Sequence, residues 1–188
     1  LYRPPKPEAD RISQPFLVPP AQVKLFTFGY HENFADTLWL RLIQDIDHCG
    51  MGLSDGLCRD DKGWVFHMLD AITETAPRFR SPYAFGATVL GVVVNDKEGA
   101  RIIYERAVER FPSDWLILYR AAHHQLNEVG NPERAAELLI QAGKNGAPGW
   151  VFALAAKLFT AEGKAFMAKT VLEDMIKQDP GSRYAPRL

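Results

Sequence analysis

The sequence predicts an all-α fold, in which helix pairs stack into an α-solenoid and an extended, proline-rich arm precedes them. Similar amphipathic segments recur about every 34 residues, a period typical of repeat proteins whose units bury their apolar faces by stacking on neighbours. Six of the 13 prolines lie within the first 20 residues. Because proline fixes φ and lacks an N–H group, this stretch should be extended rather than helical.

Composition excludes several classes of protein. The chain has 188 residues, of which 47% are hydrophobic and 24% charged, as in a globular domain. Its formal net charge of −1 provides no general attraction for nucleic acid. No uncharged apolar run approaches the roughly 20 residues of a membrane-spanning helix. We therefore expect no nucleic-acid partner and no membrane span in this chain.

The repeat is clearest in three versions of one helix, at residues 97–112, 132–148 and 163–180. Ala100, Ala135 and Ala168 mark these versions, at spacings of 35 and 33 residues. Small residues there allow two helices to cross closely, and larger residues four and seven positions later fill the space between them. Each period has room for two helices, so we expect about eight or nine helices in the chain.

Turn and capping residues delimit these helices. Ser81 and Asn131 each precede a proline, and Ser113 or Asp114 precedes an apolar helix, so these side chains are predicted N-caps. A left-handed residue that ends the first helix of a pair is expected five positions before each marker alanine, at Asn95, Gly130 and Gly163.

Helices are also predicted at both ends of the repeat region. Residues 30–47 form a leading amphipathic helix, because Phe34, Leu38, Leu42 and Ile46 recur at steps of four. This helix should pair with a second one over residues 63–75, a weaker copy of the repeat.

The final helix, over residues 164–178, carries an apolar arc that is too wide for one neighbouring helix. Its members are Phe166, Met167, Ala168, Val171, Leu172, Met175 and Ile176. Repeat arrays normally end with a polar outer face, so we expect another subunit, a missing tail or a partner to cover this one.

The repeated positions resemble the tetratricopeptide repeat (TPR) family, and residues 28–44 are similar to the leading segment of a group of bacterial repeat proteins. The last unit matches the TPR pattern at Phe152, Ala156, Phe159, Gly163, Ala168, Leu172, Met175 and Pro180. The middle unit departs from the pattern at His123, where a small residue is expected. The resemblance implies a right-handed superhelix of about four helix pairs. It divides the chain into an arm (1–19), a helical domain (20–180) and a tail (181–188).

The resemblance also implies a peptide-binding groove, because in this family the first helix of each pair lines a concave face. The positions that face the groove correspond here to Phe85, Val89, Val93, Arg120, His124, Asn127, Trp150 and Lys157. Arg120, Asn127 and Lys157 would then donate hydrogen bonds to backbone carbonyls or carboxylates. His123 is expected at the edge of the core, and Val89 can equally be a core residue.

Two cysteines flank an unusual glycine-rich insert at residues 49–63. A disulfide between Cys49 and Cys58 would close a ten-residue ring and imply an oxidising compartment, such as a bacterial periplasm or cell envelope. The alternative is a pair of free thiols, which would fit a cytoplasmic protein. No second cysteine pair or histidine pair with metal-ligand spacing accompanies them, so a metal site is not expected.

The sequence contains no motif for catalysis or cofactor binding, such as HExxH, GxSxG or a glycine-rich phosphate loop. The adjacent side chains of His123 and His124 would point about 100° apart on a helix and could not bind one ion together. We therefore expect a non-catalytic protein-interaction scaffold without a cofactor. The alternative is a helical accessory domain of a larger envelope-associated enzyme or transport assembly.

The arm gives a more specific hypothesis, in which it docks in the concave face of another copy of the chain. Proline-rich segments are low-entropy ligands for grooves. The anchoring residues would be Leu1, Tyr2, Arg3, Pro4 and Pro5. The alternative is a linker to a removed leader or membrane anchor, since the chain begins without Met.

Overall fold

The computed structural model describes residues 27–50 and 63–181, and the described part is all-helical, without strands. Its α-helices are α2 (His31–Gly50), α4 (Trp64–Thr75), α5 (Ala87–Val92), α6 (Lys97–Arg110), α7 (Trp115–His124), α8 (Pro132–Lys144), α9 (Trp150–Ala161) and α10 (Ala165–Gln178). Two π-helical turns adjoin these helices. The turn η2 (Pro82–Gly86) leads directly into α5, and the turn η3 (Gln125–Val129) directly follows α7. The all-α prediction is confirmed for this part of the chain.

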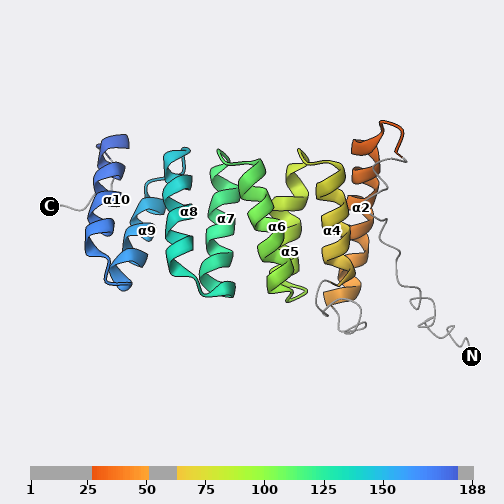
Figure 1. Ribbon diagram of the computed structural model, residues 1–188, viewed down its shortest axis with the longest axis horizontal. Coiled ribbons are helices and arrows are strands. Elements are labelled where there is room, and N and C mark those ends of the chain that lie inside the picture. Colours follow the sequence, from red (N-terminus) through yellow and green to blue (C-terminus); the bar gives the residue numbers. More distant parts are fainter. Residues whose placement is uncertain (1–26, 51–62, 182–188) are drawn as a thin grey trace, which may run out of the picture.

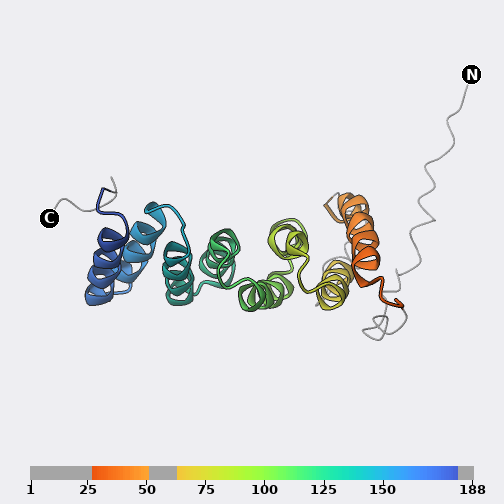
Figure 2. The same ribbon diagram turned by 90° about the horizontal axis from the view of Figure 1, so that it is seen from above.

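The helices pack side by side in one row, from α2 at one end to α10 at the other (Figure 1). Seen from above, α2, α5, α7 and α9 lie along one side of the row, and we call them the first helices (Figure 2). The second helices, α4, α6, α8 and α10, lie along the other side. Each first helix contacts the second helix that follows it, and the buried side chains join into one elongated core.

The leading pair follows its predicted boundaries, with α2 and α4 close to residues 30–47 and 63–75. Leu38 and Leu42 of α2 are buried, and Phe34 packs at the edge of the same core. The predicted four-residue apolar step therefore faces α4.

Three side chains cap later helices by accepting hydrogen bonds from backbone N–H groups. Asp96 caps α6, Asp114 caps α7 and Asn131 caps α8. The caps at Asn131 and Asp114 were predicted, and the structure selects Asp114 over the neighbouring Ser113.

The predicted left-handed residues are confirmed. Asn95, Gly130 and Gly163 have φ values of 62°, 75° and 72°. Each ends a first helix and turns the chain toward the second helix of its pair. Asn95 is one of the few side chains other than glycine that accept this conformation.

The predicted cap at Ser81 is wrong. Ser81 has helical angles (φ −60°, ψ −43°) and no capping hydrogen bond, because the helix already begins at Arg80. Pro82 is still accommodated, since the first turn of a helix has no use for the missing N–H group. The π-helical turn η2 follows directly and was not predicted.

The expected uncovered apolar face on the last helix is mostly absent. Five of its seven apolar residues are buried or half-buried against the core: Ala168, Val171, Leu172, Met175 and Ile176. Phe166 and Met167, at the start of α10, remain exposed. Lys169 and Glu173 occupy the outward side, so α10 already presents the polar face that a terminal helix needs.

Candidate peptide-binding surface

The structure divides the eight predicted groove residues into three groups. Phe85, Val93, Asn127 and Lys157 are exposed. Arg120 and Trp150 are partly buried, whereas Val89 and His124 are buried. The predicted groove positions are therefore wrong for Val89 and His124, which belong to the core.

Each first helix is joined to the next by a side-chain contact. The three contacts are Trp39 to Phe85 (ring centroids 6.4 Å apart), Arg120 Nη1 to the Ala84 carbonyl oxygen (2.7 Å) and Tyr119 to Trp150 (5.2 Å). Arg120 and Trp150 thus hold neighbouring first helices together. Of the three predicted donors, Lys157 has an exposed side chain with no ion pair among the described residues, and Asn127 donates to the His123 carbonyl oxygen of its own helix.

The Ala84 carbonyl oxygen is also the end of a partly buried polar network. It accepts a hydrogen bond from Thr88 Oγ1 at 3.0 Å, and Thr88 Oγ1 lies 2.7 Å from the Tyr104 hydroxyl. Because the Thr88 proton points at Ala84, Tyr104 is the donor to Thr88. Burial raises the pKa of Tyr104, so the phenol keeps its proton and the network stays intact at neutral pH.

His124 lies beside this network instead of in a groove. Its side chain is only 4% exposed, and its ring centroid is 5.3 Å from that of Tyr104. Nε2 is 3.1 Å from the Lys97 carbonyl oxygen, which can only accept, so Nε2 carries the proton of the neutral ring. The neighbouring His123, expected at the core edge, is exposed.

The π-helical turn η3 explains this exchange of the two histidines. A π turn contains more residues than an α turn. Because the repeat pattern assumes regular α-helix, the extra residue of this turn moves each position before it by one residue toward the N-terminus. Ala122, not His123, occupies the small-residue position in the core.

The stability of the fold should depend on pH through His124. Burial lowers the pKa of His124 below its ordinary value of 6.5. Below that value the unfolded chain binds a proton that the folded chain resists, so the free energy of unfolding falls as pH decreases from about 7 toward 5. His124→Gln, which keeps a donor but cannot titrate, should reduce this slope by up to about 1.4 kcal/mol per pH unit. Urea unfolding at several pH values measures it.

His123→Gln is the matched control, because it makes the same substitution at the neighbouring, exposed position. Equal pH dependence of the wild type and His124→Gln would contradict the assignment.

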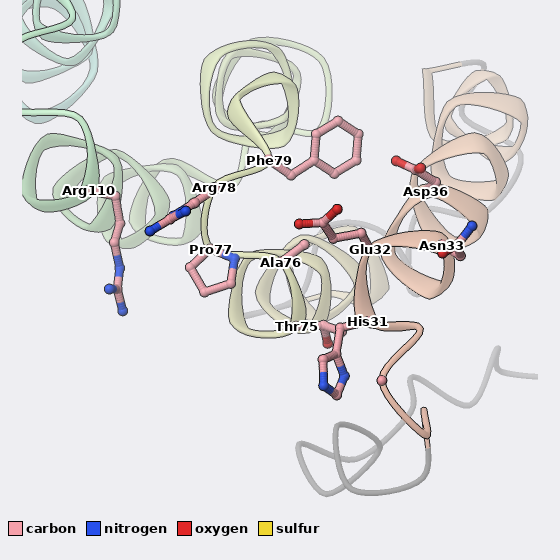
Figure 3. A pocket seen from close by; sticks show the side chains of 11 residues that line it. His31, Glu32, Asn33, Asp36, Thr75, Ala76, Pro77, Arg78, Phe79 and Arg110 are labelled. Atoms are coloured by element: carbon pink, nitrogen blue, oxygen red, sulfur yellow. The ribbon is translucent and has the colours of Figure 1, made fainter.

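A cavity of about 800 Å³ lies at one edge of the row, between the start of α2 and the turn at residues 76–79 (Figure 3). Glu32 and Asp36 project into it from α2. Arg78 and Arg110 line it from the other side of the turn. The cavity therefore has an acidic and a basic side.

These four charged side chains form no ion pair with any residue in the described part of the chain. Other charges of the same region are paired: Arg80 with Asp114, and Arg106 with Asp70 at 2.8 Å. Sequence reasoning missed the cavity, although one signal was available. Arg78 lies in the turn after α4, beside Pro77, and Arg110 ends the next second helix, two residues before Pro112.

An aromatic cluster connects the cavity to the exposed surface of η2, which continues into α5. Phe79 lines the cavity and packs edge-on against Trp39, at a centroid distance of 6.1 Å. Trp39 in turn contacts Phe85, which is 55% exposed. An apolar surface therefore leads from the cavity onto the first helices.

Two predicted features lie outside the described side chains: the disulfide between Cys49 and Cys58, and the arm with its anchors Leu1 to Pro5. Among the described residues, no helix has the length and apolarity to cross a membrane. In the same part of the chain, no group of three or more His, Cys, Asp or Glu side chains is placed to bind a metal ion. No family model, curated protein or solved structure matches the chain.

Proposed function

We infer that the chain is a non-catalytic protein-interaction scaffold, a TPR-like solenoid that binds an extended peptide on the face of its first helices. One observation carries this proposal: the apolar side chains of Phe85 in η2 and of Val92 in α5 are 55% and 69% exposed. Large exposed apolar side chains that are concentrated in one segment are typical of an interaction site.

The arm of another copy is the proposed ligand. Its proline-rich sequence should hold it in an extended form, so little conformational entropy is lost on binding. Fifteen such residues at about 3.1 Å each would span roughly 45 Å, enough to reach a second molecule. Leu1 and Tyr2 would supply the apolar contacts to Phe85 and Val92.

Replacing Phe85 and Val92 by serine should weaken binding of a labelled peptide that covers residues 1–12. Two partly exposed apolar contacts are lost, which corresponds to about a tenfold increase in Kd. Fluorescence anisotropy with the full chain as titrant measures the change.

Phe166→Ser is the matched control, because Phe166 is an exposed aromatic residue on α10, at the far end of the row. The proposal fails if the peptide does not bind, or if it binds Phe85→Ser/Val92→Ser and Phe166→Ser equally well.

A further inference from the structure

We propose that the cavity at the edge of the row is a charged extension of the peptide site, and that it receives the basic side chains Arg3 and Lys6 from the arm of a second copy. This proposal rests on the proposed function for the identity of the ligand. Its own basis is the charge and shape of the cavity between α2 and the turn at residues 76–79.

The acidic side is suited to a cationic side chain. Glu32 and Asp36 are one helical turn apart on α2, so their like charges repel each other by a few tenths of a kcal/mol. No cationic side chain in the described ranges pairs with either carboxylate. Figure 3 shows both side chains pointing toward Phe79. A bound ammonium or guanidinium would relieve the repulsion and gain charge-assisted hydrogen bonds.

Apolar side chains beside these carboxylates suit the stem of a lysine or arginine. Phe79 and Pro77 line the cavity and are both partly buried. Long basic side chains lay their methylene groups on such surfaces while the charged end reaches polar partners. A ring face near the charge adds a cation–π attraction.

The basic side is suited to an acidic residue of the same ligand. Arg78 and Arg110 lie on the opposite side of the turn from Glu32 and Asp36 (Figure 3), and the described chain supplies no carboxylate to either of them. The cavity is therefore bipolar, and a peptide that crosses the turn would need a basic residue followed by an acidic one.

The order of apolar, acidic and basic groups along the surface is complementary to the order of apolar, basic and acidic residues along the arm. From the exposed face of η2, the Phe85–Trp39–Phe79 cluster leads to the acidic side and then over the turn to the basic side. The arm has its apolar, basic and acidic residues in the same order: Leu1, Tyr2, Arg3, Lys6, Glu8 and Asp10. In an extended form, four residues span about 12 Å, which is suitable for crossing one turn of chain.

The proposal specifies a second copy because of the sequence between the arm and α2. Pro15, Pro19 and Pro20 should keep that connection extended. An extended connection of this length would allow residues 1–11 to reach another molecule.

The test uses a labelled peptide of residues 3–11 (RPPKPEADR), which lacks Leu1 and Tyr2. A second peptide carries glutamate in place of Arg3 and Lys6. The full chain and its Glu32→Lys/Asp36→Lys variant are titrated into each peptide, and anisotropy gives Kd. We expect the natural peptide to bind the variant at least tenfold more weakly than the wild type. The charge-reversed peptide should show the opposite preference, because its glutamates meet the introduced lysines.

The matched control is Glu162→Lys/Asp179→Lys, which makes the same change of net charge on exposed carboxylates at the far end of the row. It should bind both peptides as the wild type does. The preference should also weaken as salt is raised, since these charges are solvent-exposed. Equal affinity of the wild type for both peptides, or equal loss of binding in the control, would overturn the proposal.

The same titration separates this proposal from the proposed function. If the Phe85→Ser/Val92→Ser variant binds peptide 3–11 as the wild type does, and the charge preference holds, the cavity proposal is supported independently of the apolar groove. If these serines weaken peptide 1–12 but charge reversal has no effect, the groove stands and the cavity proposal fails.

Discussion

Replacing Leu69 by alanine should lower the free energy of unfolding by about 3–5 kcal/mol. Leu69 of α4 is fully buried, and the backbone of η2 rests directly on its side chain. A Cβ added at Gly86 would lie 2.3 Å from Leu69 Cδ2, so the backbone of η2 is in close contact with the leucine side chain. If that side chain is removed, neighbouring groups cannot fill the space it leaves unless a helix shifts. The lost apolar contacts and the remaining cavity both destabilise the fold. Urea denaturation of the variant and the wild type measures the difference.

Leu40→Ala is the matched control, since Leu40 is 60% exposed on α2 and should change stability by less than about 0.5 kcal/mol. The contact with Gly86 can be tested separately. Gly86→Ala should cost less when Leu69 is already alanine, because the added methyl group then enters the cavity. Similar losses for Leu69→Ala and Leu40→Ala would contradict the packing.

Gly143→Ala should destabilise the fold by about 1–3 kcal/mol, even though alanine is the better helix former. Gly143 lies near the end of α8, where the ring of Phe152 from α9 packs against its backbone. An added Cβ would lie 2.4 Å from Phe152 Cζ, and the ring is too deeply buried to turn away. Thermal or urea unfolding gives the change.

Gly91→Ala makes the same substitution where there is space. An added Cβ at Gly91 would meet its nearest atoms at 3.4 Å, an ordinary van der Waals contact. This variant should keep its stability or gain up to about 1 kcal/mol from helix propensity. If Gly143→Ala were as stable as Gly91→Ala, the close approach of α8 and α9 would be wrong.

Local chemistry allowed much of the fold to be predicted from the sequence. Asn95, Gly130 and Asn131 each act through their own backbone or the next turn, so their positions alone predicted where helices end and begin. The apolar step in α2 likewise needed only a regular helix. The Ser81 cap failed because the helix begins one residue earlier, at Arg80, which no local signal indicated.

The candidate site was harder to predict because it depends on rotation and on contacts across the row. One π-helical turn was enough to exchange His123 and His124 between core and surface. Arg120 was predicted to be a hydrogen-bond donor in the groove. Its hydrogen bond to the Ala84 carbonyl oxygen could not be predicted without the position of the neighbouring first helix. The cavity joins Glu32 to Arg110, which are 78 positions apart in the sequence, and no pattern within one repeat predicts that.

The neighbour-to-neighbour packing has a consequence for the rate of folding. The polar contacts that tie one repeat to the next close loops of similar length: Arg80 to Asp114 spans 34 residues, and Arg120 to Ala84 spans 36. The entropy lost on loop closure is therefore nearly the same at each step along the row, so no single closure should limit the rate of folding. We therefore expect that folding can begin at any one helix pair and spread in either direction along the row.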